Sequence, residues 1–209
     1  MSIVILDYGL GNVGSVANMF KLLGKDVMIS KEQSVVSKAK MIILPGVGSF
    51  DKGMEKIREN GLVHVLNKKV IIEGTPILGI CLGLQLMTKE SDEGISQGLG
   101  WFDNSCKKFE IDRLSNYKIP HMGWNEIKPI DNSIFNKLFL KIEDEIMFYF
   151  VHSYHISEFS SEVIASSNYI YDFPVVLIKN NIIGVQFHPE KSHIFGLMFL
   201  KNLLQYFNL

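Results

Sequence analysis

A cysteine bracketed by glycines lies near the middle of the chain, in Gly79-Ile80-Cys81-Leu82-Gly83. The run from 76 to 80 before it reads as a buried strand. A nucleophile between two such glycines is typical of a sharp turn from a strand into a helix, where the glycines relieve crowding around a strained backbone. The N-terminus of the following helix favours the thiolate, the reactive form of cysteine. A buried structural cysteine is the alternative, since free cysteines are often buried.

A histidine and a glutamate two residues apart follow much later, in Gln186-Phe187-His188-Pro189-Glu190. In extended chain, residues two apart point the same way, so His188 and Glu190 can lie on one side. A carboxylate beside an imidazole fixes its tautomer and stabilises the imidazolium formed when the ring takes a proton from a thiol. His-Pro-Glu alone is more often a surface turn. Together with Cys81 it supplies the base and the orienting carboxylate of a Cys-His-Glu triad.

A glycine-containing turn, Leu44-Pro45-Gly46-Val47-Gly48, follows another strand-like run. Glycines at the carboxyl end of a strand let backbone N–H groups approach a ligand closely. Donors at Val47 and Gly48, with the Leu82 N–H as the other half, would form an oxyanion hole. One donor of that kind is typically worth about 3 kcal/mol of barrier. An ordinary turn between a strand and a helix is the alternative.

Secondary-structure elements must position these turns. The first half of the chain alternates strand-like and helix-like segments. Strands are predicted at 3–6, 41–44 and 76–80, a helix with an apolar face at 16–23 closed by Gly24, and a helix at 51–67 interrupted near Gly61. Alternation of this kind predicts a mainly parallel, doubly wound α/β sheet flanked by helices.

The second half is richer in strands, predicted at 146–151, 163–166, 175–178 and 182–187. Asn180-Asn181 would turn the last two into a hairpin, and a helix at 194–207 would pack on the sheet. The sheet therefore gains an antiparallel extension. Because no repeat or linker is visible, we expect one domain over 1–209.

The bulk composition excludes several classes of protein. A formal net charge of -1 leaves no broad basic field for nucleic acid or an anionic membrane. No apolar run approaches the roughly 18 residues needed to span a bilayer. The N-terminus lacks a signal-peptide pattern, and two reduced cysteines fit a cytoplasmic protein, with Cys106 unreactive in an unpatterned segment. His152 and His155 lack a third ligand, so no metal is expected. The glycines of the 9–14 turn lack the G-x-G-x-x-G order of a dinucleotide-binding site, so no cofactor is expected.

Taken together, these segments resemble the class I, triad-type glutamine amidotransferases, and within that class the glutaminase subunits of imidazole glycerol phosphate synthases. The resemblance covers essentially the whole chain. The glycine-bracketed cysteine and His-Pro-Glu belong to the wider class, whereas PHMGWN and FYFVHSY indicate the narrower group. The residues on which the resemblance rests are 7–9 with Gly11, Asn12 and Ser15; 44–48 with Phe50; 79–85; 120–125; 148–154; and 186–192.

The resemblance implies hydrolysis of glutamine to glutamate and ammonia through a γ-glutamyl thioester on Cys81. His188 would act as base and then acid, with Glu190 behind it. The implied substrate-binding residues are Gly46, Gln85, Glu93, Ser153 and Tyr154.

The implied partner is a (β/α)8 barrel synthase, which uses the ammonia to make imidazole glycerol phosphate and an aminoimidazole carboxamide ribotide in histidine biosynthesis. The positions implied at the contact with it are Asn12, Met122, Trp124 and Lys191.

Three alternatives stay open. His155 and the stretch 192–196 are similar to paralogues that supply ammonia for amidination of bacterial surface sugars. A stand-alone cysteine hydrolase would not need PHMGWN, and a non-catalytic partner protein should show a broken triad. For Trp124, which the resemblance places at the interface, the alternative is a tryptophan buried in the core.

Overall fold

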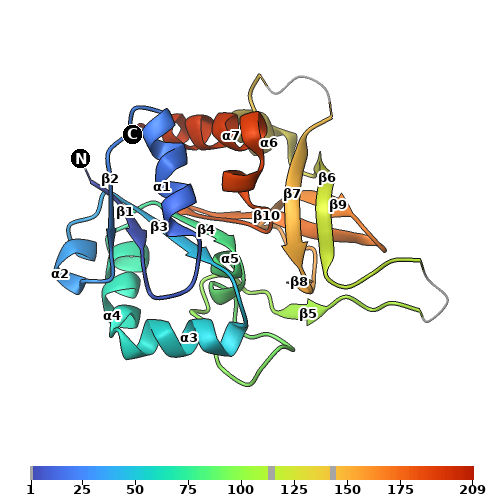
Figure 1. Cartoon of the computed structure of the whole chain (residues 1–209), viewed down its shortest axis with the longest axis horizontal. Coiled ribbons are helices and arrows are strands. Elements are labelled where there is room, and N and C mark those ends of the chain that lie inside the picture. The colour runs from blue at the N-terminus through green and yellow to red at the C-terminus, as the bar shows by residue number, and fades with distance from the viewer. Residues whose placement is uncertain (1, 113–115, 142–144) are drawn as a thin grey trace.

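A nine-stranded mixed sheet forms the centre of the computed structural model, which describes residues 2–112, 116–141 and 145–209 (Figure 1). Its parallel half, in spatial order, is β2 (Val27–Ser30), β1 (Ile3–Leu6), β3 (Met41–Gly46), β4 (Ile77–Cys81) and β11 (Ile182–Val185). Its antiparallel half continues with β10 (Asp172–Lys179), β9 (Val163–Asn168), β6 (His121–Pro129) and β7 (Met147–His152). The predicted α/β fold class with an antiparallel extension is confirmed.

Helices cover both faces of the sheet (Figure 1). One face carries α1 (Val13–Leu22), α6 (Asn132–Leu138) and α7 (His193–Tyr206). The other carries α3 (Phe50–Glu59), α4 (Leu62–Asn67) and α5 (Leu82–Leu86). Shorter elements are α2 (Gln33–Val36), the π-helix η1 (Lys68–Ile72), the 3-10 turn η2 (Pro189–Lys191), and a small antiparallel sheet of β5 (Cys106–Lys108) and β8 (Tyr154–Ile156).

Strand β1 shows why the parallel strands read as continuous apolar runs. Ile3 and Ile5 contribute to the core beneath α1 and α7, whereas Val4 and Leu6 contribute to the core beneath α3 and α4. All four side chains are buried, because a strand covered by helices on both faces has no polar side.

Most predicted elements are present, with small shifts at their ends. The helix predicted at 51–67 divides where expected: Gly61 has a φ of 64°, a left-handed conformation that ends α3 and starts α4. The hairpin between β10 and β11 turns at Asn180, whose φ is 55°. One prediction is wrong, since Cys106 lies in strand β5 and not in an unpatterned segment.

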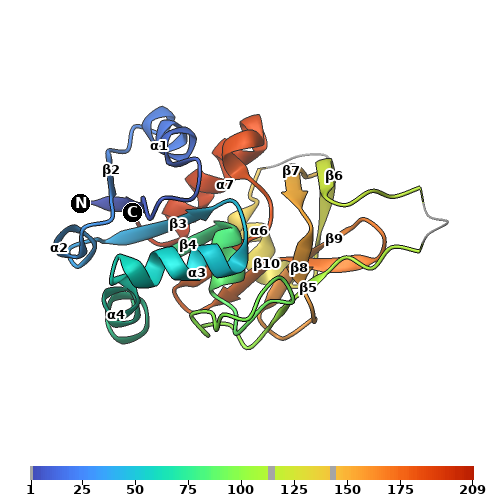
Figure 2. The same ribbon diagram turned by 60° about the horizontal axis from the view of Figure 1, so that its bottom comes forward.

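The antiparallel half is larger than predicted, because β6 was not expected as a strand. Figure 2 shows β6 and β7 at the opposite end of the molecule from β1 and β2. Trp124 of β6 is 43% exposed, so it is not a core residue. Among the described residues, no helix has both the length and the apolar character to cross a membrane.

The sheet topology determines where the chemistry-bearing turns gather. Strands β1, β3, β4 and β11 run in the same direction, so their carboxyl ends meet at one edge of the sheet. The turns that leave this edge contain Tyr8, Val47, Cys81 and His188. Ligands of open α/β sheets bind at such an edge.

Candidate active site

Cys81 lies at the end of β4, directly before α5, with a φ of 54° and a ψ of -108°. The two flanking glycines permit this bend. A Cβ at Gly83 would overlap the carbonyl oxygen of Leu44, and one at Gly79 would lie 2.9 Å from the carbonyl oxygen of Gly83. Helix α5 therefore packs against β3 and β4 more closely than any larger residue allows, which is the physical reason for the glycine bracket.

The Cys81 sulfur lies among three groups that are distant in sequence. It is 3.9 Å from the Val151 carbonyl oxygen and 3.6 Å from Gln186 Nε2, and His188 completes the set. Since the residue is only 6% exposed, the sulfur is reached through a pocket and not from open surface.

His188 and Glu190 are paired behind the sulfur. His188 Nδ1 lies 2.8 Å from Glu190 Oε1, so it donates to the carboxylate, which leaves Nε2 to exchange a proton. Nε2 is buried without a hydrogen-bond partner in the described residues, and Cys81 is its neighbour in the electrostatics of the site. Burial alone would lower the pKa of His188, but the charges of Cys81 and Glu190 raise it to about 10. The arrangement therefore favours the imidazolium form of His188 beside the sulfur.

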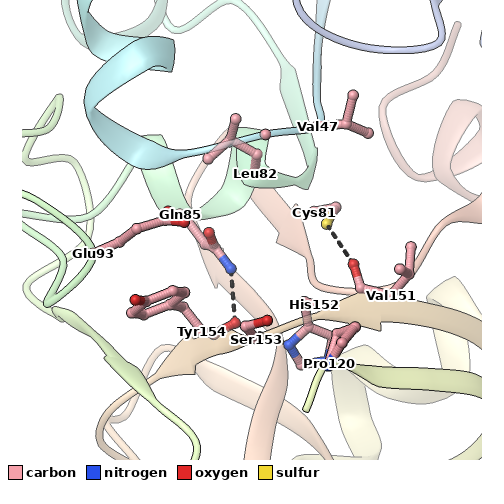
Figure 3. A pocket seen from close by; sticks show the side chains of 11 residues that line it. Val47, Cys81, Leu82, Gln85, Glu93, Pro120, Val151, His152, Ser153 and Tyr154 are labelled. Atoms are coloured by element: carbon pink, nitrogen blue, oxygen red, sulfur yellow. Dashed lines mark hydrogen bonds between the residues drawn. The ribbon is translucent and has the colours of Figure 1, made fainter.

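A cavity of about 400 Å³ opens over the sulfur (Figure 3). It brings together most of the residues predicted for the site, from β4, α5, β8 with the residue before it, and the loops after β3 and α5. The lining residues are Val47, Gly48, Cys81, Leu82, Gln85, Glu93, Pro120, Val151, His152, Ser153 and Tyr154.

Gln85 is fixed one helical turn after the cysteine. Its Nε2 donates to the Tyr154 carbonyl oxygen at 2.9 Å, as Figure 3 shows, and to Gln186 Oε1 at 3.1 Å. The side chain is 4% exposed, so both donors of its amide are held inside the protein. Its carbonyl end is the part that a ligand can use.

Glu93 stands on the loop after α5, at the wall of the cavity. Its Oε2 accepts from the Phe50 N–H at 2.8 Å, at the start of α3. The pKa of the Glu93 carboxyl is raised, because burial and the nearby Asp51 outweigh the lowering effect of the Phe50 N–H. The loop is anchored by Asp51, whose carboxylate accepts from the N–H groups of Ile95 and Ser96 at 3.1 and 2.9 Å. A carboxyl group is thus held at a fixed position in the wall.

The turn after β3 faces the cysteine. Gly46 pairs with Cys81 in the register of β3 and β4, and Val47 and Gly48 line the cavity. Gly46 does not line it; a Cβ there would lie 2.6 Å from the Tyr8 hydroxyl, so the residue is packed behind the wall. Gly48 has a φ of 111°, which only glycine adopts at little cost.

Three features of the site were missed by sequence reasoning. Gln186 is fully buried and links Gln85 to the Cys81 sulfur, although its motif was recognised only for His188 and Glu190. The Tyr8 hydroxyl is buried without a hydrogen-bond partner in the described residues, and burial and the charge of Cys81 raise its pKa. The Val151 carbonyl has no sequence signature at all.

The residues expected at a partner contact are exposed or half-buried and lie on three elements. Asn12 caps α1 by accepting from the Ser15 N–H at 3.2 Å. On β6, Met122 is 61% exposed, and the ring of Trp124 stacks on His193 with a centroid distance of 5.6 Å. The Lys191 ammonium lies 5.4 Å from the centroid of the Tyr149 ring.

The two histidines considered for a metal have other partners. His152 contacts His121 and the Tyr154 carbonyl, and His155 contacts Tyr171 and the Ile156 carbonyl. No three His, Cys, Asp or Glu side chains gather in a metal-binding arrangement in the described part of the chain. Burial raises the pKa of the Cys106 thiol to about 12, so this second cysteine is kept as a thiol.

Comparison with known proteins agrees with this geometry. The family model for glutamine amidotransferase class-I matches residues 4–204. The imidazole glycerol phosphate synthase subunit HisH 2 of Methanococcus maripaludis is 49% identical over 97% of this chain and 98% of its own. The protein of the same name from Pseudomonas aeruginosa is 41% identical over 97% and 98%.

Solved structures show the same fold at low identity. The structure of PurLQS from Thermotoga maritima has a chain with a TM-score of 0.69 at 15% identity, covering 98% of this chain and 98% of its own. The glutaminase domain of Trypanosoma brucei CTPS, solved with acivicin, has a TM-score of 0.67 at 16% identity, covering 98% and 94%. With the family model spanning nearly the whole sequence, this chain belongs to the class-I glutamine amidotransferase family.

Proposed function

We propose that this chain, as one glutamine amidotransferase domain over 1–209, is the cytoplasmic glutaminase subunit of an imidazole glycerol phosphate synthase. The observation that carries the proposal is the strained cysteine at the carboxyl edge of the sheet, paired with His188 and Glu190 above a cavity that fits an amino acid. Relatives named HisH at 39–49% identity over nearly the full length support this assignment.

Each group of the site has a role in amide hydrolysis. The Cys81 thiolate attacks the carboxamide carbon of glutamine, and N–H groups of Leu82 and the Val47-Gly48 turn stabilise the oxyanion. The His188 imidazolium gives its proton to the leaving amine, so the C–N bond breaks and ammonia departs from a γ-glutamyl thioester. A water then attacks the thioester carbon, and His188 takes one of its protons. Glutamate leaves, and the thiolate is restored beside the imidazolium. Glu190 holds the ring through Nδ1 in both halves.

The cavity wall supplies groups for the amino-acid end of the substrate. Glu93 places a carboxylate where the substrate's α-ammonium group can pair with it. Gln85, Ser153 and Tyr154 offer amide and backbone groups on the adjacent wall. These contacts would select glutamine and hold its carboxamide carbon against the sulfur.

The ammonia has to reach an acceptor before it escapes to water. We propose that a (β/α)8 barrel synthase docks on the surface formed by Asn12, Met122, Trp124 and Lys191 and receives it. Trp124 supports this, because it is a large ring left 43% exposed and rigidly stacked. Tryptophans held in this way are frequent anchors of protein interfaces.

A second candidate pathway is amidination of a bacterial surface sugar by the same ammonia chemistry. Several relatives are numbered copies, HisH 2 in Methanococcus maripaludis and Pseudomonas aeruginosa and HisH 1 in Campylobacter jejuni. A number distinguishes one copy from another, so one of a pair is free to serve a different acceptor.

The chemistry is tested by replacing Cys81 with alanine and measuring glutamine hydrolysis with the barrel partner present. Activity should disappear, and a glutamine-analogue electrophile should label Cys81 and spare the buried Cys106, as mass spectrometry of the peptides would report. Cys106→Ala is the matched control and should retain activity. Hydrolysis within tenfold of the unmodified protein in the Cys81→Ala variant would refute the assignment.

The pathway is tested by adding a histidine-pathway barrel synthase and its ribonucleotide substrate. Stimulation of glutaminase activity by at least about a hundredfold, the worth of one oxyanion donor, is the expected result. Binding without stimulation by that synthase would favour the surface-sugar alternative.

A further inference from the structure

A chain of buried hydrogen bonds runs from strand β6 to the wall of the cavity. Asn125 Nδ2 lies 3.2 Å from His121 Nε2, and His121 Nδ1 lies 3.1 Å from His152 Nε2. His152 Nδ1 lies 2.9 Å from the Tyr154 carbonyl oxygen. His121 and His152 are 2% and 6% exposed, so water does not replace these contacts.

The tautomers follow from the acceptor at the cavity end. A carbonyl oxygen only accepts, so His152 Nδ1 must carry the proton that it shares with Tyr154. Neutral His152 then has a bare Nε2, which accepts from His121. His121 Nδ1 is therefore the donor, and its Nε2 is bare in turn.

The Asn125 end of this series of hydrogen bonds independently gives the same direction of donation. Asn125 Nδ2 donates to the Asn168 carbonyl at 2.7 Å, and Asn125 Oδ1 accepts from the Glu126 N–H at 2.9 Å. These two bonds fix the orientation of the amide, so its contact with His121 Nε2 must be a donation. The contacts at both ends of the series therefore require that donation runs from Asn125 toward Tyr154 and that His121 and His152 are both neutral.

Burial supports this protonation state. It lowers the pKa of His121 to about 4 and that of His152 well below its usual value. A proton added to either ring would set two N–H groups against each other, since neither Nε2 would then accept.

The Tyr154 carbonyl joins this chain to the nucleophile. Gln85 Nε2 donates to the same oxygen and to Gln186 Oε1, and Gln186 Nε2 lies 3.6 Å from the Cys81 sulfur. The network therefore continues without a gap from Asn125 to the sulfur. In Figure 3, His152 lies beneath this part of the wall, beside Pro120.

We propose that His121 and His152 are positioning residues, which hold the Tyr154 carbonyl and through it Gln85 in the geometry that binds glutamine. The proposal rests on the proposed glutaminase function. It also gives β6 a second role, because Met122 and Trp124 point outward from the strand whose buried side carries His121 and Asn125. A partner that contacts the outer side of β6 is thus one residue away from the network.

The matched control is His155, which is also buried and also packs against the ring of Phe109. Its nitrogens contact the Ile156 carbonyl at 2.7 Å and the Tyr171 hydroxyl at 2.9 Å. It therefore shares the packing environment of His152 but not the hydrogen-bond chain.

The experiment compares His152→Leu, His152→Asn and His155→Leu by steady-state glutaminase kinetics with saturating partner. Leucine at 152 removes one of the two donors to the Tyr154 carbonyl and should raise KM for glutamine about tenfold, as expected for the loss of one buried hydrogen bond that fixes its position, with a smaller change in kcat. Asparagine keeps an N–H near the position of Nδ1 and should bring KM back within about threefold. His155→Leu should lower the thermal midpoint while leaving KM within about twofold.

If His152→Leu does not fold, His121→Phe serves instead, because a phenyl ring fits between Phe150 and Tyr169, at 5.0 and 4.1 Å from the present ring. It should also raise KM. An unchanged KM, an asparagine variant as impaired as leucine, or an equal KM effect of His155→Leu would overturn the proposal. Absence of glutamine hydrolysis by the unmodified complex would instead refute the glutaminase function.

Discussion

Replacing Cys81 by glycine should give a more stable protein than replacing it by alanine. With a φ of 54° and a ψ of -108°, this residue has nearly the conformation of the first central residue of a type II′ turn, which glycine dominates. Alanine keeps the Cβ that makes this conformation unfavourable, and glycine removes it. Both variants lose the sulfur, so the comparison isolates the backbone strain.

The magnitude follows from two opposing terms. Strain at a sparsely populated backbone conformation costs about 1–3 kcal/mol. The added freedom of glycine in the unfolded chain costs roughly 0.5–1 kcal/mol. The difference of these ranges is roughly 0–2.5 kcal/mol, so the glycine variant should be more stable by about 1 kcal/mol, which corresponds to roughly 2–4 °C in thermal midpoint for a chain of this size.

The assay is thermal or denaturant unfolding of both variants, with glutaminase activity measured alongside. Both should be inactive, because neither has the Cys81 thiol. The control is Ala17→Gly inside α1, where φ is helical and glycine should cost about 1 kcal/mol. A Cys81→Gly protein no more stable than Cys81→Ala would show that the backbone at position 81 is not strained.

Three further predictions concern other parts of the site. Because burial holds the pKa of His121 near 4 and an unfolded histidine titrates near 6.5, only the unfolded state takes up this proton between those values, so unfolding free energy should fall with falling pH by about 1.4 kcal/mol per unit for this residue. His121→Phe should reduce that slope by up to about 1.4 kcal/mol per unit in denaturant titrations at pH 6, 5.5 and 5, while His152 and His155, whose pKa values burial also lowers, keep their own contributions. His188, whose pKa is raised to about 10, contributes an opposing slope mainly above pH 6.5, so the titrations stay below that value. Glu93→Gln and Glu93→Ala should both raise KM for glutamine, but only alanine should also lower the unfolding midpoint, since glutamine still accepts from the Phe50 N–H. Trp124→Ala should weaken binding of the barrel partner by at least about thirtyfold in titration calorimetry while leaving alkylation of Cys81 by iodoacetamide unchanged.

Most of the parallel half of the fold was predictable because its signals are local, but the edge strand β2, whose Met28 and Ile29 are exposed, was missed. A strand buried on both faces is a continuous apolar run, and β1, β3 and β4 each lead into a turn that contains glycine. Strand β6 gave no such signal. Its buried side carries His121 and Asn125, and its exposed side carries Met122 and Trp124, so the usual alternation of apolar and polar residues is reversed. A strand whose inner residues form a polar network is invisible to a hydrophobic pattern.

The site divides in the same way. Cys81, His188 and Glu190 were identified because each lies in a short motif with a distinctive spacing. Gln186 and the Val151 carbonyl contact the sulfur only after strands distant in sequence are paired. A backbone carbonyl has no residue type to recognise, so only the folded structure identifies this contact.

The turn after β3 combines a fixed residue with an adjustable one. At Gly46 a Cβ would lie 2.6 Å from the Tyr8 hydroxyl and 2.9 Å from Leu82 Cβ, so neighbouring atoms confine the backbone there. At Gly48 the nearest such atom would be 4.0 Å away, and Val47 is 42% exposed. A change in the direction of an oxyanion donor is therefore least costly at the peptide between Val47 and Gly48. Because Gly46 stays in register with Cys81, that peptide can turn without moving the nucleophile.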